Sequence, residues 1–153
     1  MADNRRLMRD VSQVGREIST IFDGHLRQHG LTLARARILL QLIKNDCATS
    51  QSSVTEHLQV EHPTAVRILD GLEALGYIAR TQAPGDRRAK NVELTDTGRP
   101  LAERVVATID GLNSVLLEGV DPGDAEIASS VLEILLANLA TLKAGTPAPS
   151  DLK

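Results

Sequence analysis

Three cations stand within four positions of the segment GDRRAKNVELT, residues 85–95: Arg87, Arg88 and Lys90. The chain as a whole carries a formal net charge of -3, so crowding like charges here adds repulsion and no evident stability. Guanidinium and ammonium groups in such a cluster are suited to binding an anion, and phosphate above all. The alternative is a solvated turn without a partner, and the elements around the cluster must decide between the two.

Charge is unevenly distributed along the rest of the chain. Residues 1–44 hold eight Lys/Arg against four Asp/Glu, and residues 77–100 hold five against three, so both stretches are basic. The other two stretches, 45–76 and 101–153, are acidic. A low overall charge therefore does not exclude nucleic-acid binding, because binding depends on a local patch. It does argue against indiscriminate coating of DNA.

The composition indicates what kind of hydrophobic core supports the elements around these cations. Apolar residues make up 42% of the 153 residues, but Phe22 and Tyr77 are the only aromatic ones. A core of Leu, Ile, Val and Ala favours interlocking helices over a β-sandwich. Cys47 is the single cysteine, so the sequence provides neither an internal disulfide framework nor a cysteine-based zinc site.

Apolar periodicity predicts long helices at both ends of the chain. Apolar residues repeat at spacings of four and three over residues 7–25, the pattern of a helix that buries one stripe against another helix. Gly30 ends this helix, and a second helix is expected over residues 31–45. The same periodicity predicts two further helices over residues 101–118 and 122–143.

The middle of the chain carries the pattern of a helix-turn-helix. A short helix begins after Ser50, a good N-cap, and a longer helix with Pro63 in its first turn follows a bend at residues 59–61. On the longer helix Thr64 and Arg67 are expected on the outer face, where Gly71 leaves room for close approach. The buried face is expected to comprise Ala65, Ile68, Leu69, Leu72 and Leu75. Such a helix fits the major groove of DNA, where Arg and Thr side chains reach base edges.

A β-hairpin is expected directly behind this helix pair. Residues 77–81 and 91–95 alternate like two strands, and the loop QAPGDRRAK joins them. The basic cluster then lies near the tip of the hairpin. A thin hairpin that carries arginine can enter the minor groove, whose negative potential attracts guanidinium. The ordered set of elements therefore favours DNA as the partner of the cluster.

The residues that carry this pattern also resemble the MarR family of winged-helix regulators, and most of all its SlyA-type branch. The hallmark of the family's wing is Asp-x-Arg, five residues, then Leu-Thr, and this chain has it as Asp86, Arg88, Leu94 and Thr95. The resemblance covers roughly residues 5–143. It implies an obligate homodimer in which the first helix and the last two helices interlock.

Site residues follow from the resemblance. It implies that Arg88 is the minor-groove arginine and that Asp86 is the carboxylate that braces it. Residues at the start of the short helix are expected to contact phosphate. The predicted DNA-binding residues are Ser50, Gln51, Thr64, Arg67, Asp86, Arg87, Arg88 and Lys90.

Two positions depart from the family's pattern. Gln59 stands where the family usually has a turn glycine, and Glu61 stands where it often has a capping serine. The Glu61 carboxylate is expected to accept the same backbone N–H bonds as the serine, although its negative charge disfavours a phosphate nearby. We therefore expect an operator preference that differs from that of close relatives.

The predicted fold class is mainly α with a small β-hairpin wing, a winged helix-turn-helix domain plus a helical dimerisation domain. Residues 1–30 form the N-terminal dimerisation helix, and residues 31–100 form the winged helix-turn-helix domain. Residues 101–143 form the C-terminal dimerisation helices. Residues 144–153, rich in Pro, Gly and small side chains, form a flexible tail.

The predicted function is a sequence-specific regulator of transcription that binds double-stranded DNA as a homodimer on a palindromic operator, and more narrowly a ligand-responsive repressor. The resemblance suggests a small aromatic or phenolic acid as effector. Its binding site stays open, with Arg16, His25, Thr32 and Arg37 as groups able to meet a carboxylate. Because no apolar run approaches ~18 residues and no signal peptide is evident, we expect a cytoplasmic protein without a membrane segment.

Other classes of function remain as alternatives. One is a nucleoid-type architectural DNA binder that needs no effector, and another is a protein-interaction module that uses the helical dimer alone. An enzyme is not expected, because no phosphate loop, nucleophile elbow or metal-ligand spacing is present, and no cofactor is expected.

Histidine and cysteine raise two minor possibilities. The pairs His25/His29 and His57/His62 suggest a metal site, but each lacks the third and fourth ligands that such sites usually need. His25 is instead expected to be a buried core residue. Cys47 has no basic neighbour in sequence that would evidently activate its thiol, so we expect it to be a bystander rather than a redox sensor.

Overall fold

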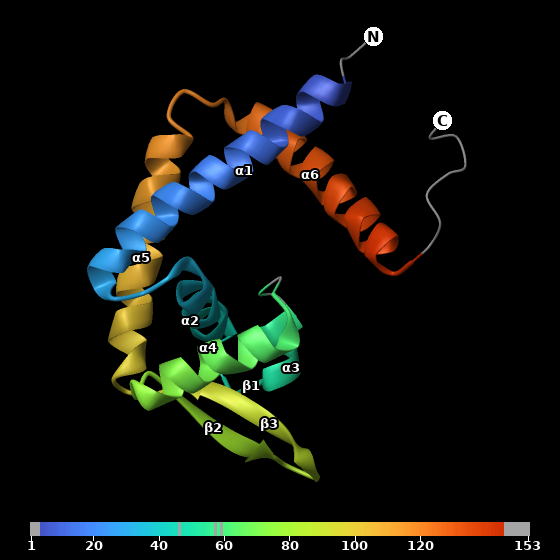
Figure 1. The fold of residues 1–153 in the computed structure, drawn as a ribbon. Helices are drawn as coiled ribbons and strands as arrows, with labels where there is room; N and C mark the ends of the chain where they lie inside the picture. The colour runs from blue at the N-terminus through green and yellow to red at the C-terminus, as the bar shows by residue number, and fades with distance from the viewer. Residues whose placement is uncertain (1–3, 46, 57, 59, 146–153) are drawn as a thin grey trace. The chain divides into compact units, whose positions relative to one another are not determined.

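The structure, a computed structural model, describes residues 4–45, 47–56, 58 and 60–145, and describes Arg87 by its backbone alone (Figure 1). Its elements are, in chain order, α1 (Asn4–Leu26), the 3-10 helix η1 (Arg27–His29), α2 (Leu33–Asn45), β1 (Thr49–Ser50), α3 (Gln51–Glu56), α4 (His62–Ala74), β2 (Ile78–Ala83), β3 (Asp86–Leu94), α5 (Gly98–Leu116) and α6 (Pro122–Lys143). The predicted fold class, mainly helical with a small sheet, is confirmed.

The chain packs as two compact units, Met1–Asn113 and Ser114–Lys153. The boundary lies inside α5, so the first unit holds everything from α1 through most of α5, and the second holds the end of α5 and α6. Each unit is described by itself below.

The core of the first unit is built almost entirely from aliphatic side chains. It draws on α1, α2, α3, α4, the sheet and the start of α5. Its largest fully buried side chains are Leu26, Leu31, Ile38, Leu39, Leu58, Leu69, Leu72, Ile78, Val54, Val92 and Val105. Phe22 is also buried, whereas Tyr77 is only partly buried against the cluster. The low aromatic content thus leads to a helical aliphatic core, as the composition predicts.

The junction of α1 and α2 is fixed by polar contacts at a sharp turn. Gly30 adopts a left-handed conformation, with φ 70°, which favours glycine. One carboxylate oxygen of Asp23 accepts a hydrogen bond from the Leu33 N–H at 2.9 Å, and the other accepts from Arg27 Nε at 3.0 Å. The Thr32 hydroxyl accepts weakly from the Arg35 N–H at 3.4 Å. The first turn of α2 is therefore held by a side chain from α1.

The sheet has three strands in the order β1-β3-β2, and all neighbours are antiparallel. The short strand β1 was not predicted from the sequence. It pairs Thr49 with Val92 and Ser50 with Asn91, which places the start of α3 directly on the hairpin. A two-residue strand is too short to show the alternation from which strands are read.

The hairpin is longer than the sequence predicts. The strands were expected over residues 77–81 and 91–95 with a nine-residue loop, but β2 and β3 leave only Pro84 and Gly85 between them. Gly85 has φ 83°, so the chain reverses at a position that glycine accommodates. The basic cluster therefore lies in β3 itself, because backbone pairing extends through residues whose polar side chains look like a loop.

The base of the hairpin is tied to α5 by Thr95. Its hydroxyl donates to the Gly76 carbonyl oxygen at 2.6 Å and accepts from the Gly98 N–H at 3.0 Å. Gly98 lies so close to Tyr77 that an added Cβ would stand 1.9 Å from the Tyr77 carbonyl oxygen. The Leu-Thr end of the wing motif therefore has a structural task, which is to join the hairpin to the next helix.

In the second unit α6 begins at Asp121, whose carboxylate accepts a hydrogen bond from the Gly123 N–H at 2.8 Å, with Pro122 following. The helix has no buried residue among those described, although its mean hydropathy reaches 1.5 over an 18-residue window. By length and composition alone it is long and apolar enough to cross a membrane. We expected no apolar segment of that length, because charged residues such as Glu133 divide the sequence into shorter apolar runs. That expectation was wrong, since the mean hydropathy of the whole helix stays high despite those charges.

Candidate nucleic-acid interface

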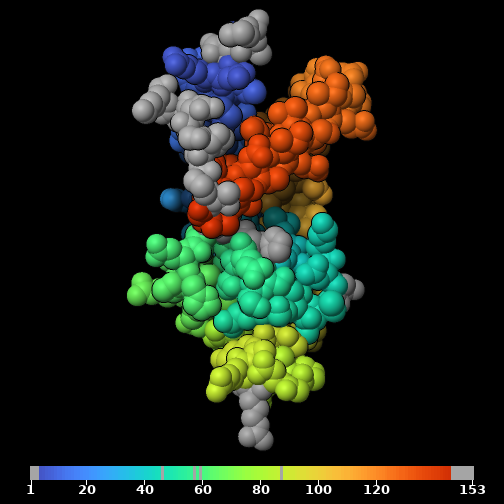
Figure 2. Space-filling view, turned by 90° about the vertical axis from the view of Figure 1, so that its right-hand side faces the viewer, coloured from blue at the N-terminus to red at the C-terminus, as the bar shows by residue number. Residues whose placement is uncertain are grey.

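The helices α3 and α4 lie side by side on one face of the first unit, directly above the hairpin (Figure 2). Ser50 caps α3 as predicted, since its hydroxyl accepts from the Ser53 N–H at 3.2 Å. The longer helix follows the bend and starts at His62, with Pro63 in its first turn as predicted. The pair has the geometry of a helix-turn-helix followed by a wing.

Glu61 does not cap α4 with its side chain. Its backbone is extended, with φ -63° and ψ 147°, and no side-chain hydrogen bond reaches the helix. Its carbonyl oxygen instead accepts from the N–H groups of Thr64 and Ala65, at 2.9 and 3.0 Å. The expected carboxylate cap was therefore wrong, and the exposed carboxylate faces solvent beside the start of α4. The other departure from the family's pattern, Gln59, lies outside the described residues.

The outer face of α4 carries the two side chains predicted for it. Thr64 and Arg67 are exposed, and among the described residues Arg67 has no ion pair. Ala65, Leu69 and Leu72 are buried as expected. Ile68 is half-buried and packs against the core. The prediction was wrong for Leu75, the C-cap residue of α4, which is 49% exposed.

Gly71 serves a different purpose from the one expected. The guanidinium of Arg35 from α2 lies over it, and an added Cβ would stand 2.9 Å from Arg35 Nη2. The space on α4 is thus filled by an arginine of the same chain rather than left open. Arg35 adds a second cation to the region of Thr64 and Arg67, a contribution that the sequence did not reveal because it depends on how α2 crosses α4.

The cations of the wing lie where the pairing register of β2 and β3 is irregular. Gln82 pairs with Lys90, but Ala83 pairs with Asp86, so the register of β2 and β3 shifts between Gln82 and Ala83. Bulges of this kind bend a strand and redirect side chains. Arg88 and Lys90 are exposed, and nothing is described of the Arg87 side chain. The Asp86 carboxylate accepts from the Arg88 N–H at 2.8 Å, and the predicted brace of the Arg88 guanidinium stays a prediction.

Gln51 differs from the other predicted site residues. It is only half-buried, but its Oε1 atom is shielded from solvent and has no hydrogen-bond partner among the described residues. An unpartnered buried oxygen of this kind is costly. The side chain is therefore less open to a phosphate than Ser50, which is exposed at the same end of α3.

An ion-pair cluster that sequence reasoning missed joins the recognition helix to the wing. Arg80 on β2 donates from Nε to the Glu73 carboxylate at 2.9 Å and from Nη2 to the Asp70 carboxylate at 2.6 Å, and Nη2 also contacts Glu73. The Arg80 side chain is only 13% exposed. In the sequence, Glu73 and Asp70 lie seven and ten positions before Arg80, a spacing that only weakly indicates an ion pair. The ion pairs form because the chain turns back from α4 into β2.

Two members of the Arg80 cluster have shifted pKa values. Hydrogen bonding to the Arg80 guanidinium lowers the pKa of Glu73 below its usual value, against a smaller opposing effect of desolvation. Hydrogen bonding to Glu73 in turn raises the pKa of Arg80. Both shifts favour the charged forms of Glu73 and Arg80, which hold the wing to α4 by charge-assisted bonds.

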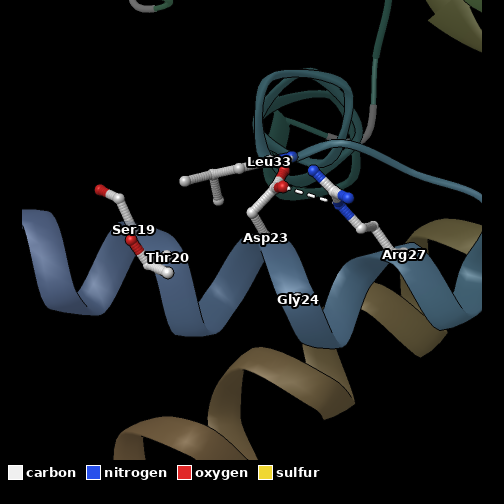
Figure 3. A pocket seen from close by; sticks show the side chains of 6 residues that line it. All are labelled: Ser19, Thr20, Asp23, Gly24, Arg27 and Leu33. Atoms are coloured by element: carbon white, nitrogen blue, oxygen red, sulfur yellow. Dashed lines mark hydrogen bonds and ion pairs between the residues drawn. The ribbon is translucent and has the colours of Figure 1, made fainter.

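A cavity of about 600 Å³ lies at the α1–α2 junction, lined by Ser19, Thr20, Asp23, Gly24, Arg27 and Leu33 (Figure 3). Its two charged groups, Asp23 and Arg27, bind each other. The hydrogen bond from the Leu33 N–H, followed by that from Arg27, lowers the pKa of Asp23. Because its charges are already satisfied, this cavity offers little to an ionic ligand.

The four groups considered for an effector do not meet at one place. Arg16, His25 and Thr32 are exposed, and Arg37 lines a separate cavity between α2 and α3. His25 is not buried in the chain, so that expectation was wrong, whereas His29 is half-buried and contacts the Thr108 hydroxyl at 3.0 Å. Among the described residues no three His, Cys, Asp or Glu side chains come together as a metal site would require. Cys47 is exposed.

The geometry defines a winged helix-turn-helix protein: an exposed helix face with Arg67, a capped helix before it, and a hairpin with cations at its tip. Comparison with known proteins agrees. The family model described as the MarR family matches residues 29–89 of the chain. The chain belongs to the MarR family of winged-helix, DNA-binding transcriptional regulators.

Solved structures similar to the chain extend over nearly all of it. Transcriptional regulator PA3341 is 31% identical with a TM-score of 0.80, and the match covers 88% of this chain and 98% of that one. MepR from S. aureus, in its DNA-binding conformation, is 25% identical with a TM-score of 0.77, covering 90% and 99%; MepR has also been solved in complex with DNA. A SlyA-like regulator from Listeria monocytogenes has a TM-score of 0.80 at 21% identity, covering 97% and 99%, which shows a shared fold and no more.

Proposed function

We propose that the chain is a ligand-responsive repressor that binds a palindromic operator as a homodimer in the cytoplasm. In this proposal α4 enters the major groove with Thr64 and Arg67, and the wing reaches the minor groove with Arg88. Ser50 and Lys90 contact phosphates, and Gln51, Asp86 and Arg87 complete the site. Assignment to the SlyA-type branch stays a prediction.

The main support for the proposal is that α4 and the wing each present an exposed cation without an ion pair, and that the Arg80 cluster holds these two elements together. Arg67 on α4 and Arg88 on β3 have no ion pair among the described residues, while Arg80 between them is fully engaged with Glu73 and Asp70. Cations without ion pairs on two elements of fixed relative position suit a partner with regularly spaced phosphates, such as double-stranded DNA. The DNA complex of MepR supports the same partner for this chain.

Exposed apolar side chains support the homodimer. In the second unit they include Ile127, Ile134 and Leu136, which are 66%, 62% and 58% exposed. In the first unit Leu7 and Val14 on α1 are 48% and 55% exposed. A soluble monomer rarely leaves so many large apolar side chains in water, so a second copy is the expected cover. A dimer would present two recognition helices about one DNA turn, ~34 Å, apart.

A gel-shift titration tests the proposal. The probe is the DNA upstream of the protein's own coding region, with scrambled DNA as competitor at fixed salt. A discrete shift that survives the competitor supports a site-specific regulator. A diffuse shift that the competitor removes would favour the architectural binder instead.

Arg88→Ala tests the wing. We expect the dimer to persist and operator affinity to fall by about 1–3 kcal/mol, with the largest loss where the wing meets A·T steps. Arg104→Ala, an exposed arginine on α5, serves as the matched control and should bind as the parent does. Equal affinity and specificity in the parent and Arg88→Ala would remove the wing from the interface.

A further inference from the structure

The helix α2 packs against α4 (Figure 1), and the side chain of Arg35 on α2 reaches across to α4. Its guanidinium lies over Gly71, where a Cβ added to the glycine would stand 2.9 Å from Arg35 Nη2. A larger residue at position 71 would therefore occupy the place that the guanidinium takes. Glycine at this position lets Arg35 lie on the surface of α4.

The side of α4 that receives Arg35 is also the side that carries the predicted DNA-binding residues. Thr64, Arg67 and Gly71 follow one another at spacings of three and four residues, so they lie in one row along the helix. The Arg35 guanidinium therefore lies over the helical turn that follows Arg67. In this way α2 adds a cation to the surface that α4 presents.

The charge of Arg35 is not neutralised within the part of the chain that the structure describes. Arg35 is half-buried, and no described carboxylate forms an ion pair with it. By contrast, Arg80, which reaches α4 from β2, is bound to Glu73 and Asp70. Partial burial removes water from a charged group, and this loss is costly unless a partner replaces the water. The position of Arg35 therefore suits an anion supplied by another molecule.

We propose that Arg35 binds a DNA phosphate at the edge of the major groove and that Gly71 positions it for this contact. The inference rests on the proposed function, which places α4 in the groove. The N-terminal residues of a recognition helix contact base edges, so the second half of α4, where Gly71 lies, is expected beside the phosphates that border the groove. A guanidinium matches a phosphate with two parallel N–H···O bonds. Such a contact fixes the position of the helix and carries no sequence information.

Fluorescence anisotropy of labelled DNA measures the contribution of Arg35. The probes are the duplex upstream of the coding region and a scrambled duplex, each at salt concentrations between about 50 and 200 mM. Arg35→Gln should weaken binding to both duplexes by a similar factor of at least about ten, as expected for a hydrogen bond to a charged group. Its plot of log affinity against log salt should become shallower by about 0.9 for each copy of the chain bound. Arg35→Lys should keep the parent's slope, and Arg104→Gln should behave as the parent does.

Gly71→Ala tests the positioning role without removing a charge. The atom that the added Cβ would meet is the end of a flexible side chain, so the guanidinium should move aside at little cost. Since alanine is the better helix former, the thermal stability of this variant should equal or exceed that of the parent. Its DNA affinity should nevertheless fall severalfold. In the Arg35→Gln background the same change should have no further effect, because the guanidinium is already absent.

The possible results separate this inference from the proposed function. If the parent binds DNA and Arg35→Gln matches its affinity and salt slope, Arg35 makes no contact, although the regulator stands. A loss confined to the upstream duplex, with an unchanged slope, would indicate a base contact and overturn the phosphate contact. Additive effects of Gly71→Ala and Arg35→Gln would mean that the added Cβ itself meets the DNA, which overturns the positioning role. If the parent binds both duplexes equally and the expected losses occur, Arg35 keeps its contact while the operator-specific function is removed.

Discussion

At the scale of single residues, Gly98 lies where two segments of backbone pass close to each other. Its missing side chain lets the start of α5 pass against the Tyr77 carbonyl, where a Cβ would stand 1.9 Å from the oxygen. Since the neighbour is backbone rather than the end of a flexible side chain, no rotamer change relieves the contact. We expect Gly98→Ala to destabilise the fold by about 1–3 kcal/mol, measured by urea unfolding.

Gly111 on the same helix provides the matched control for that prediction. No heavy atom lies within 4 Å of the position that a Cβ on Gly111 would take, and alanine is the better helix former. Gly111→Ala is therefore expected to be neutral or to stabilise by up to roughly 1 kcal/mol. If Gly98→Ala and Gly111→Ala were equally stable, the start of α5 would move away from Tyr77 without cost, and the prediction for Gly98 would be wrong.

At the scale of elements, the Arg80 cluster holds β2 to α4. Because the pKa of Glu73 is lowered in the folded chain, its contribution to stability is present above its unfolded pKa of about 4.5 and is lost as the pH falls through the lower folded value. The Glu73 side chain is 39% exposed, so solvent screening keeps the effect small, at about 0.2–1 kcal/mol.

Urea unfolding at pH 7 and pH 3 checks the prediction for the Arg80 cluster. Glu73→Gln should lose less stability than the parent over this interval, because it has no carboxylate to protonate. In a double-mutant cycle, Glu73→Gln and Arg80→Gln should be less than additive at pH 7 and closer to additive at pH 3. Identical pH dependence in the parent and Glu73→Gln would mean that the pair contributes nothing to folding.

At the scale of the whole molecule, the proposed dimer accounts for the apolar surface of α6. Ile134, 62% exposed, is expected to be buried by the second copy, so Ile134→Asp should raise the dimer dissociation constant at least tenfold, or about 1.4 kcal/mol. Analytical ultracentrifugation measures the change. Ser129→Asp adds the same charge at an exposed polar position of α6 and should leave the dimer intact. A parent that sediments as a monomer at micromolar concentration would refute the dimer.

The order of the main helices and the hairpin, the aliphatic core and the wing motif could all be predicted from the sequence. These features depend on local periodicity, on caps such as Ser50 and on turn residues such as Gly30, all of which can be read within a few positions. The left-handed backbone of Gly30, with φ 70°, agrees with the predicted end of the first helix.

Only the tertiary structure decided which side chains meet. Arg80 reaches Glu73 and Asp70 because α4 turns back into β2, and Arg35 covers Gly71 because α2 crosses α4. The strand β1 exists through its backbone pairing with β3, and the register shift near Arg88 through the pairing of β3 with β2. Backbone pairing depends little on side-chain type. Contacts of this kind join positions distant in sequence, and no local pattern encodes them.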